Sequence, residues 1–238
     1  MVLREKHHML PWIMAVVFFS LCAMLCVPTR NAMPAFEPSA QGTVYVLDAG
    51  HGGEDGGAVS CGGIRESDIN LAVTLRLDTL LHFLGRQTVR TREADISIHA
   101  PDAETLRQKK TSDLKNRVSL VNGTPGAVLI SIHQNSLPSV PSVHGAQVFF
   151  GTAAGGEELA LSIQEALNQS VNPKNEKQAK KIDPSIYLMK NVTCPAVLVE
   201  CGFLSNAAEA EQLLQPEHQK RIAAAIAAGI LKAEREEP

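Results

Sequence analysis

The sequence predicts a single α/β domain in which a mostly parallel, twisted β-sheet carries helices on both faces. Short apolar runs that end at glycine or at polar residues have the composition of strands buried on both faces. They alternate with longer segments in which apolar residues recur at helical spacing, the order expected of a parallel sheet. The chain has 238 residues, 45% of them hydrophobic and 20% charged, a length that suits one core better than two.

The first half of the predicted domain alternates strands and helices. Residues 44–48 (VYVLD) form an apolar run that leads into glycine, as a buried strand does. Residues 68–84 carry one apolar stripe at helical spacing, and Gly85 follows at the position that glycine favours after a helix. Residues 87–91 are the next predicted strand. Residues 112–122 form a helix with its leucine and valines on one face.

The second half continues the alternation. A polar, basic stretch at residues 172–181 predicts an exposed loop. Proline at the first turn favours a helix starting at Pro216. The predicted elements of this half are strands at 127–132 (AVLISI), 146–150 (AQVFF) and 195–199 (PAVLV), and helices at 157–169, 207–214 and 216–235.

The N-terminus has the pattern of an export segment. Arg4 and Lys6 precede residues 9–27, a run of 19 residues without a charged side chain. A helix of that length spans about 28 Å, close to the ~30 Å hydrocarbon core of a membrane. Positive charge before the run keeps the N-terminus inside and exports the rest. An uncleaved anchor, a removed signal peptide and a buried core helix are the three interpretations, with the anchor favoured. The predicted organisation is a signal or membrane anchor at residues 1–30, a linker at 31–42 and a globular domain at 43–238.

Charge and composition exclude one class of partner. The formal net charge is −3 and aromatic residues make up only 4% of the chain. Nucleic-acid binding calls for a basic surface and often for aromatic stacking platforms. We therefore expect no nucleic-acid partner.

Candidate metal ligands follow three predicted strands. His51 comes shortly after the first strand, His133 directly after the strand at 127–132, and Glu200 directly after the strand at 195–199. Glu66 precedes the first long helix, where the chain returns to the same edge of the sheet. Ligands of such sheets gather beyond the carboxyl ends of the strands. Two imidazoles and one carboxylate, with a position left open for water, are a catalytic zinc ligand set, and Glu200 is then placed to act as general base.

Each of these residues also has an ordinary structural interpretation. A single histidine after a strand is more often structural, and Glu66 alone is an acidic residue at a helix start that interacts favourably with the helix dipole.

The glycine-rich loop at 50–63 is not a phosphate cradle, because it lacks the Lys-Ser/Thr pair of a P-loop and contains Glu54 and Asp55. A serine or cysteine nucleophile is not indicated either. No serine lies in a G-x-S-x-G elbow, and no residue near Cys201 in the sequence is an evident general base for its thiol.

At these residues the chain resembles the zinc-dependent N-acetylmuramoyl-L-alanine amidases of bacterial cell walls, the amidase-3 type. The resemblance implies that His51, Glu66 and His133 bind Zn²⁺ and that Glu200 is catalytic. Two positions depart from the common pattern, Gln134 in place of alanine and Cys201 in place of threonine. The matching segments are 47–53 (LDAGHGG) with Asp55 and Gly57, Arg65-Glu66, Thr91-Arg92 with Asp95, Arg117 with Asn122, 131–135 (SIHQN), Gly145 and 198–206 (LVECGFLSN).

The resemblance implies a peptidoglycan substrate. The bond cleaved is the amide between N-acetylmuramic acid and L-alanine, so residues 43–238 are expected to be a zinc amidase catalytic domain acting outside the cytoplasm, anchored to the membrane or secreted. The chain is most similar to the germination-specific spore-cortex amidases, which implies a role in muramic δ-lactam formation. The alternatives are another zinc peptidoglycan hydrolase, either a carboxypeptidase or a deacetylase, and a non-catalytic peptidoglycan-binding domain. The oligomeric state and any need for a protein activator are left open.

Overall fold

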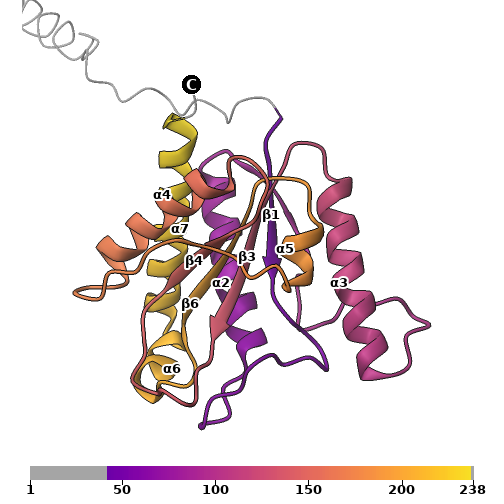
Figure 1. Cartoon of the computed structure of the whole chain (residues 1–238), viewed down its shortest axis with the longest axis horizontal. Coiled ribbons are helices and arrows are strands. Elements are labelled where there is room, and N and C mark those ends of the chain that lie inside the picture. The colour runs from indigo at the N-terminus through magenta and orange to yellow at the C-terminus, as the bar shows by residue number, and fades with distance from the viewer. Residues whose placement is uncertain (1–41, 237–238) are drawn as a thin grey trace, which may run out of the picture. The chain divides into compact units, whose positions relative to one another are not determined.

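A computed structural model describes residues 42–236 of the chain (Figure 1). The strands are β1 Val44–Ala49, β2 Gln87–Arg90, β3 Ala127–Asn135, β4 Gln147–Phe150, β5 Lys180–Lys181 and β6 Ala196–Phe203. The helices are α2 Glu66–Phe83, α3 Leu106–Gly123, α4 Gly156–Ser170, α5 Tyr187–Asn191, α6 Ala207–Leu213 and α7 Pro216–Glu236.

Within residues 42–236, six strands form one sheet in the order β2-β1-β3-β6-β4-β5. The pairs β1–β2, β1–β3, β3–β6 and β4–β5 are parallel, whereas β4 runs antiparallel to β6. The α/β class is confirmed, and the sheet is mostly parallel as expected, with one antiparallel pair that makes it mixed. An antiparallel strand toward the edge of a parallel sheet is a common arrangement.

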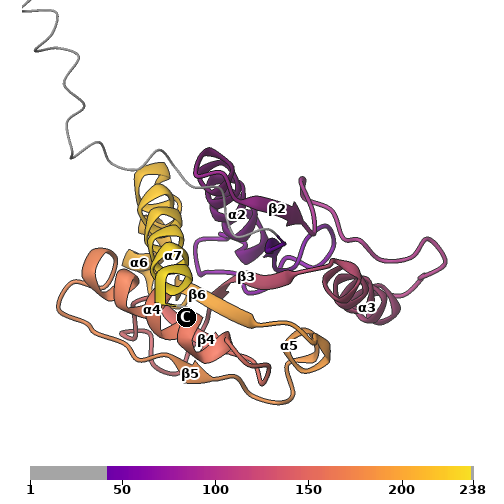
Figure 2. The same cartoon turned by 90° about the horizontal axis from the view of Figure 1, so that it is seen from above.

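The sheet has a hydrophobic cluster on each face. Leu47 and Ile130 point into the larger cluster, which α2, α4 and α7 cover. Their sequence neighbours Val46 and Leu129 point the opposite way, into a smaller cluster with residues of α3 and α5. This alternation follows the two-residue period of a strand. Figure 2 shows α2 and α7 on one side of the sheet and α3 and α5 on the other.

Local sequence explains where two of the helices begin and end. The helix α2 ends as predicted, because Gly85 takes a φ of 72° and the backbone N–H of Arg86 donates to Leu81 O at 2.9 Å. The helix α3 begins six residues before its predicted start. Thr105 and Gln108 form a capping box there, in which each side chain accepts a hydrogen bond from the backbone of the other.

Other differences from the prediction lie near the carboxyl ends of the strands. The strand β3 continues through His133 to Asn135, and β6 continues through Glu200 to Phe203. Both candidate residues therefore lie within strands rather than in the loops after them. The exposed stretch at 172–181 ends in the two-residue strand β5, and the short helix α5 was not predicted.

The predicted anchor at residues 1–30 and nearly all of the linker at 31–42 lie outside the described residues. Among the helices between residues 42 and 236, none is both long and apolar enough to cross a membrane. The export segment and the domain boundaries stay predictions from the sequence.

Candidate metal centre

The loop after β1 and the start of α2 bring two candidate ligands together. The ladder between β1 and β3 continues one step beyond β1, since Gly50 N donates to Ile132 O at 3.1 Å. His51 follows in the left-handed conformation, with a φ of 62°, which is uncommon for a residue other than glycine and turns the chain out of the sheet. The loop then returns and ends at Glu66, the first residue of α2.

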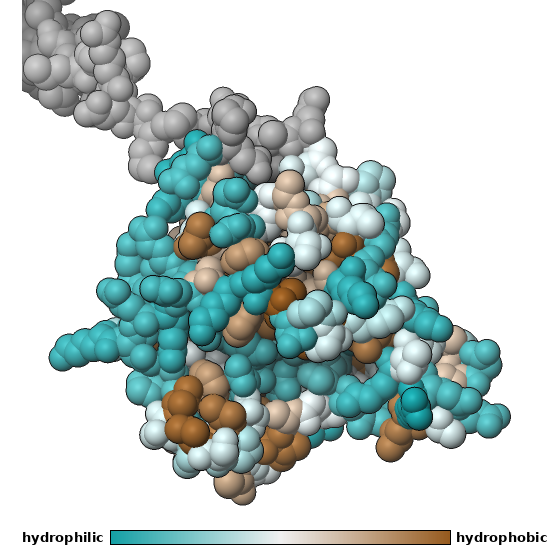
Figure 3. Space-filling model, viewed as in Figure 1, coloured by the Kyte–Doolittle hydropathy of each residue, from teal (hydrophilic) through white to brown (hydrophobic). Residues whose placement is uncertain are grey.

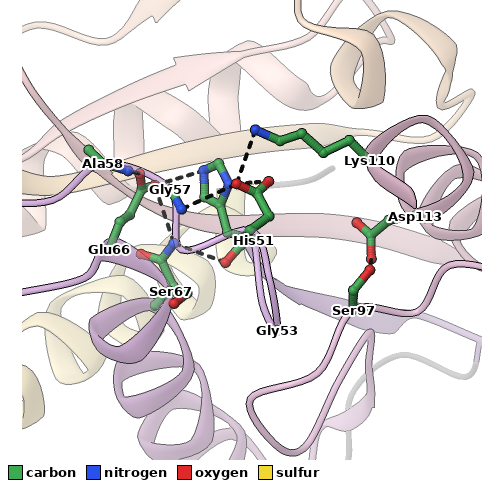
Figure 4. Close-up of polar contacts among 12 residues, drawn as sticks. His51, Gly53, Gly57, Ala58, Glu66, Ser67, Ser97, Lys110 and Asp113 are labelled. Atoms are coloured by element: carbon green, nitrogen blue, oxygen red, sulfur yellow. Dashed lines mark hydrogen bonds and ion pairs between the residues drawn. The ribbon is translucent and has the colours of Figure 1, made fainter. Parts of the chain in front are cut away.

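His51, Glu66 and His133 converge on one point. Each offers a nitrogen or carboxylate oxygen, and these three atoms all lie within 4.8 Å of one another. Glu66 Oε1 lies 3.3 Å from His51 Nε2 and 2.9 Å from His133 Nδ1. The two imidazole rings meet edge to face with centroids 5.1 Å apart. Figure 4 shows the ring of His51 beside Glu66. Separated in the sequence by up to 82 positions, the three residues thus form a compact ligand set.

Glu200 lies beside this cluster. In the register of β3 and β6 it is the direct neighbour of His133, so the two side chains emerge on the same face of the sheet. Its Oε2 atom is buried, and no residue of the described chain forms a hydrogen bond with it. Burial raises the pKa of the Glu200 carboxyl to about 7. A carboxyl with one buried, unpartnered oxygen, next to possible metal ligands, has the properties of a group that exchanges protons.

The cluster has a distinct charge state before any ion binds. Burial alone would raise the pKa of the Glu66 carboxyl, but hydrogen bonds with His133 and His51 outweigh burial and hold that pKa well below its usual range. Burial alone would lower the pKa of His51, but its hydrogen bonds with Asp55 and Glu66 raise that pKa to about 9. An anionic Glu66 between imidazoles is suited to a cation, provided that His51 gives up its proton.

Asp55 orients His51. Its Oδ2 atom lies 2.9 Å from His51 Nδ1, which leaves Nε2 directed at Glu66. The other oxygen, Oδ1, lies 3.0 Å from Lys110 Nζ, which reaches in from α3 as Figure 4 shows. A carboxylate on the remote nitrogen of a histidine fixes the tautomer that can bind a metal through the other nitrogen.

The side chain of Asn70 holds the Glu66 carboxylate directly, and the side chain of Gln134 supports Asn70. Asn70, one turn further along α2, donates from Nδ2 to Glu66 Oε1 at 3.3 Å and to Gly50 O at 3.1 Å. Its Oδ1 accepts from Gln134 Nε2 at 3.1 Å. The second carboxylate oxygen, Glu66 Oε2, accepts from Ala58 N at 2.9 Å. The carboxylate is therefore held in one orientation by groups from three segments.

A buried arginine fixes the backbone that carries His51. Arg117 is 2% exposed and forms an ion pair with Asp48 at 2.5 Å. Its Nη2 donates to His51 O at 2.8 Å, and its Nη1 donates to Ala49 O at 2.8 Å. Arg92 donates from Nε to Ala49 O at 2.9 Å. Arg117 thus has a structural role at the site, as a buried salt bridge and not as a solvated helix residue.

Two glycines allow the ligands to approach so closely. A Cβ atom on Gly50 would lie 2.2 Å from His133 Cε1, so the imidazole packs directly on the backbone there. Gly57 has a φ of 68°, and a Cβ atom on it would lie 2.5 Å from Glu66 Oε2. Both positions lie in the glycine-rich loop at residues 50–63, where the absence of a Cβ atom permits this close approach.

The structure brings together all four residues that the sequence singled out. It adds Asp55, Asn70 and Gln134 as partners of the candidate ligands, roles that were not predicted. Asn70 lies four residues after Glu66 on one helix face, and this spacing could have indicated the contact. Nothing in the local sequence indicates that Gln134, on β3, meets a side chain of α2.

Two imidazoles and a carboxylate that could hold a metal ion, beside the carboxyl of Glu200 at one edge of the sheet, are features of α/β metal-dependent hydrolases. The sequence profile of the N-acetylmuramoyl-L-alanine amidase family (Amidase_3) matches residues 46–232. The chain belongs to this family, which confirms the resemblance seen in the sequence. Its activity is that of an N-acetylmuramoyl-L-alanine amidase of peptidoglycan.

Individual relatives agree with this assignment. The chain is 34% identical over 230 residues to the germination-specific N-acetylmuramoyl-L-alanine amidase of Bacillus subtilis, covering 97% of this chain and 96% of that one. The CwlD amidase of Clostridioides difficile, solved in complex with the GerS lipoprotein, is 39% identical with a TM-score of 0.77, covering 80% of this chain and 98% of that one. An N-acetylmuramoyl-L-alanine amidase of Clostridium difficile 630 is 26% identical with a TM-score of 0.72, covering 84% and 100%.

Proposed function

We propose that this amidase uses a zinc ion held by His51, Glu66 and His133, with Glu200 as its general base. The observation that carries the proposal is the convergence of two imidazole nitrogens and a carboxylate oxygen within 4.8 Å. This donor set fits zinc, since nitrogen and carboxylate ligands with one position left open are typical of catalytic zinc sites. The buried, unpartnered Oε2 atom of Glu200 also fits a zinc ion at this site, because a nearby cation would stabilise the negative charge of the carboxylate.

The chain's own residues then divide the reaction between them. A bound zinc ion supplies a Lewis acid that lowers the pKa of water to about 7 and polarises a carbonyl. Glu200 takes a proton from the attacking water and delivers it to the nitrogen of L-alanine as the amide bond breaks. In the metal-free protein burial raises the pKa of the Glu200 carboxyl, and a raised pKa makes a carboxylate a better proton acceptor near neutral pH. Asp55 and Asn70 keep His51 and Glu66 oriented throughout.

We further propose that the enzyme acts on spore cortex, where removal of stem peptides permits formation of muramic δ-lactam. The similarity to a germination-specific amidase along nearly the whole of both chains supports this role. The CwlD amidase was solved in complex with a lipoprotein, and we infer that a lipoprotein is a candidate protein partner here. Mass analysis of cortex from spores that lack this chain tests the role, and the expected result is loss of muramic δ-lactam.

The activity is tested by mass analysis of muropeptides after digestion. Wild-type protein should release intact stem peptides from unbroken glycan. Glu200→Ala should keep zinc and lose turnover, whereas His51→Ala should lose both. The exposed Glu157→Ala and His82→Ala are matched controls and should resemble the wild type.

Chelation tests the metal directly. Exhaustive metal removal should abolish turnover, and added zinc should restore it. Turnover that survives metal removal would refute the zinc mechanism. Release of a terminal amino acid or of acetate, in place of stem peptides, would indicate a carboxypeptidase or a deacetylase instead.

A further inference from the structure

Three neighbouring strands each place one polar side chain in a row across the site. His133 on β3 is paired with Glu200 on β6, and Glu200 is paired with Gln147 on β4. Paired residues of adjacent strands share a face and lie about 5 Å apart. All three side chains are half-buried. The row therefore leads from the candidate metal centre past the general base toward the β5 edge of the sheet.

The strand β5 continues this face at the edge of the sheet, beside β4 and far from β2 (Figure 2). Its residue Lys180 is paired with Phe149, two positions after Gln147 on β4. Lys180 therefore shares the face of the row. The side chain of Gln147 reaches toward the same segment, since its Nε2 donates to Gln178 O at 2.9 Å.

Residues 174–181, which we call the basic segment, carry unpaired positive charge. No ion pair joins any lysine of this segment to another residue between positions 42 and 236. Its only acidic residue is Glu176. Lys177 Nζ lies 5.9 Å from the ring centroid of Phe203, the last residue of β6. The face that contains this segment is largely hydrophilic in Figure 3. The lysines are Lys174, Lys177, Lys180 and Lys181.

Asparagine side chains hold the backbone of this region in place. Asn172 exchanges two hydrogen bonds of 2.8 Å with the backbone of Ala146, the residue before β4. Asn168 accepts from Lys177 N at 3.1 Å and donates to Lys177 O at 2.8 Å. A Cβ atom on Gly145 would lie 2.7 Å from Asn175 Nδ2, so the two segments lie in close contact. Because its backbone is already ordered, the segment can present its charges with little further loss of entropy.

The other end of the site differs in charge. On the α3 side, Lys109 forms an ion pair with Glu54, and Lys110 forms one with Asp55. Their positive charges are already balanced. The lysines of α3 that line the pocket at His51 are thus paired, whereas those toward β5 form no ion pair, although Glu209 attracts Lys177. A ligand with free carboxylates, repelled by Glu200, is therefore attracted more strongly toward β5 than toward this part of α3.

We infer that the basic segment, together with Gln147, is the subsite for the acidic stem peptide of the substrate. The inference rests on the proposed function. The peptide runs from Glu200 across β4 to β5, which leaves the glycan on the α3 side. Two strand spacings and an offset of two residues along the strands separate Glu200 from Lys180 by about 12 Å, and an extended peptide covers that distance in about four residues. A carboxylate of the stem peptide can therefore meet Lys180 or Lys177 while the scissile amide lies at Glu200.

The test compares two substrates that differ only in charge, muropeptides with free stem-peptide carboxylates and the same muropeptides with those carboxylates amidated. Wild-type enzyme should cleave the free form with a kcat/KM about tenfold higher, as expected when two partly exposed charge pairs are lost. Lys177→Gln/Lys180→Gln should reduce kcat/KM for the free form by about the same factor, mainly through KM, and leave the amidated form unchanged. The control Lys220→Gln/Lys232→Gln removes the same charge from α7, on the opposite face, and should retain the preference.

The wild-type comparison needs no variant and stands even if a variant folds poorly. Equal turnover of the two substrates by the wild type would overturn the subsite. A double variant that keeps the wild-type preference for free carboxylates would also overturn the subsite. Failure to release any stem peptide from either substrate would instead refute the proposed function itself.

Discussion

Gly50→Ala tests the metal centre without altering any ligand. A Cβ atom at this position would lie 2.2 Å from Cε1, 2.3 Å from Nε2 and 2.7 Å from Nδ1 of His133. Ordinary contact between such atoms is about 3.5 Å or more, so the imidazole must move by about 1.3 Å. A metal site tolerates errors of only about 0.2 Å in its ligand distances. We therefore expect His133 to be lost as a ligand.

The expected loss in zinc affinity is at least about 100-fold. Disturbing a group that merely orients a ligand costs about 10- to 100-fold, and displacing a ligand costs at least as much. The added methyl group should also destabilise the fold by about 1–3 kcal/mol, as overpacking does. Competition with a chromogenic chelator measures the affinity, and thermal unfolding of the metal-free protein measures the stability.

Gly62→Ala is the matched control. A Cβ atom there would meet nothing closer than Ser60 Oγ at 3.7 Å, and the residue has no positive φ. Its zinc affinity should equal that of the wild type. Wild-type affinity in Gly50→Ala, with a folded protein, would refute the contact between His133 and the backbone on which this reasoning depends.

Two further predictions concern buried charge and protons. Asp48→Asn should lower the free energy of unfolding by about 3 kcal/mol in denaturant titrations, because the buried Arg117 keeps only Asp113 as a negatively charged partner. Burial alone would raise the pKa of Asp48, but Arg117, together with the hydrogen bond from Ser131 and the charge of His133, outweighs burial and lowers that pKa to about 2. This stabilisation is thus present above about pH 4, is lost as the pH falls through 2, and should be absent from the variant. Equal acid unfolding of the two proteins would contradict the prediction. In the metal-free protein His51 has a pKa raised to about 9, so zinc binding at pH 7.5 should release about one proton and strengthen as the pH rises toward 9. Titration calorimetry in buffers of different ionisation enthalpy measures that proton, and a heat of binding independent of buffer would count against it.

The sequence by itself determined most of the secondary structure. Apolar periodicity and glycine or proline at the ends of segments are local properties, and they located β1, α2, β2 and α7 to within two residues. The polar residues that follow the apolar runs were also visible in the sequence. This is why His51, Glu66, His133 and Glu200 could be singled out before their positions in space were known.

The direction of β4 and the presence of β5 were decided by tertiary structure. Nothing local distinguishes a parallel from an antiparallel strand when both are short and apolar. The four residues of β4 run antiparallel to β6, and the two residues of β5 are defined only by their pairing with β4. The helix α5 has five residues, too few for a helical period to show in the sequence.

The chemistry of the site likewise depends on contacts between distant residues. Glu66 meets His133 across 67 positions, and Arg117 reaches Asp48 across 69. Whether Glu200 carries a proton depends on how deeply the folded chain buries it, because desolvation acts only after folding. Residue types and their order are written along the chain, whereas distances, orientations and pKa values follow from packing between segments that the sequence keeps far apart.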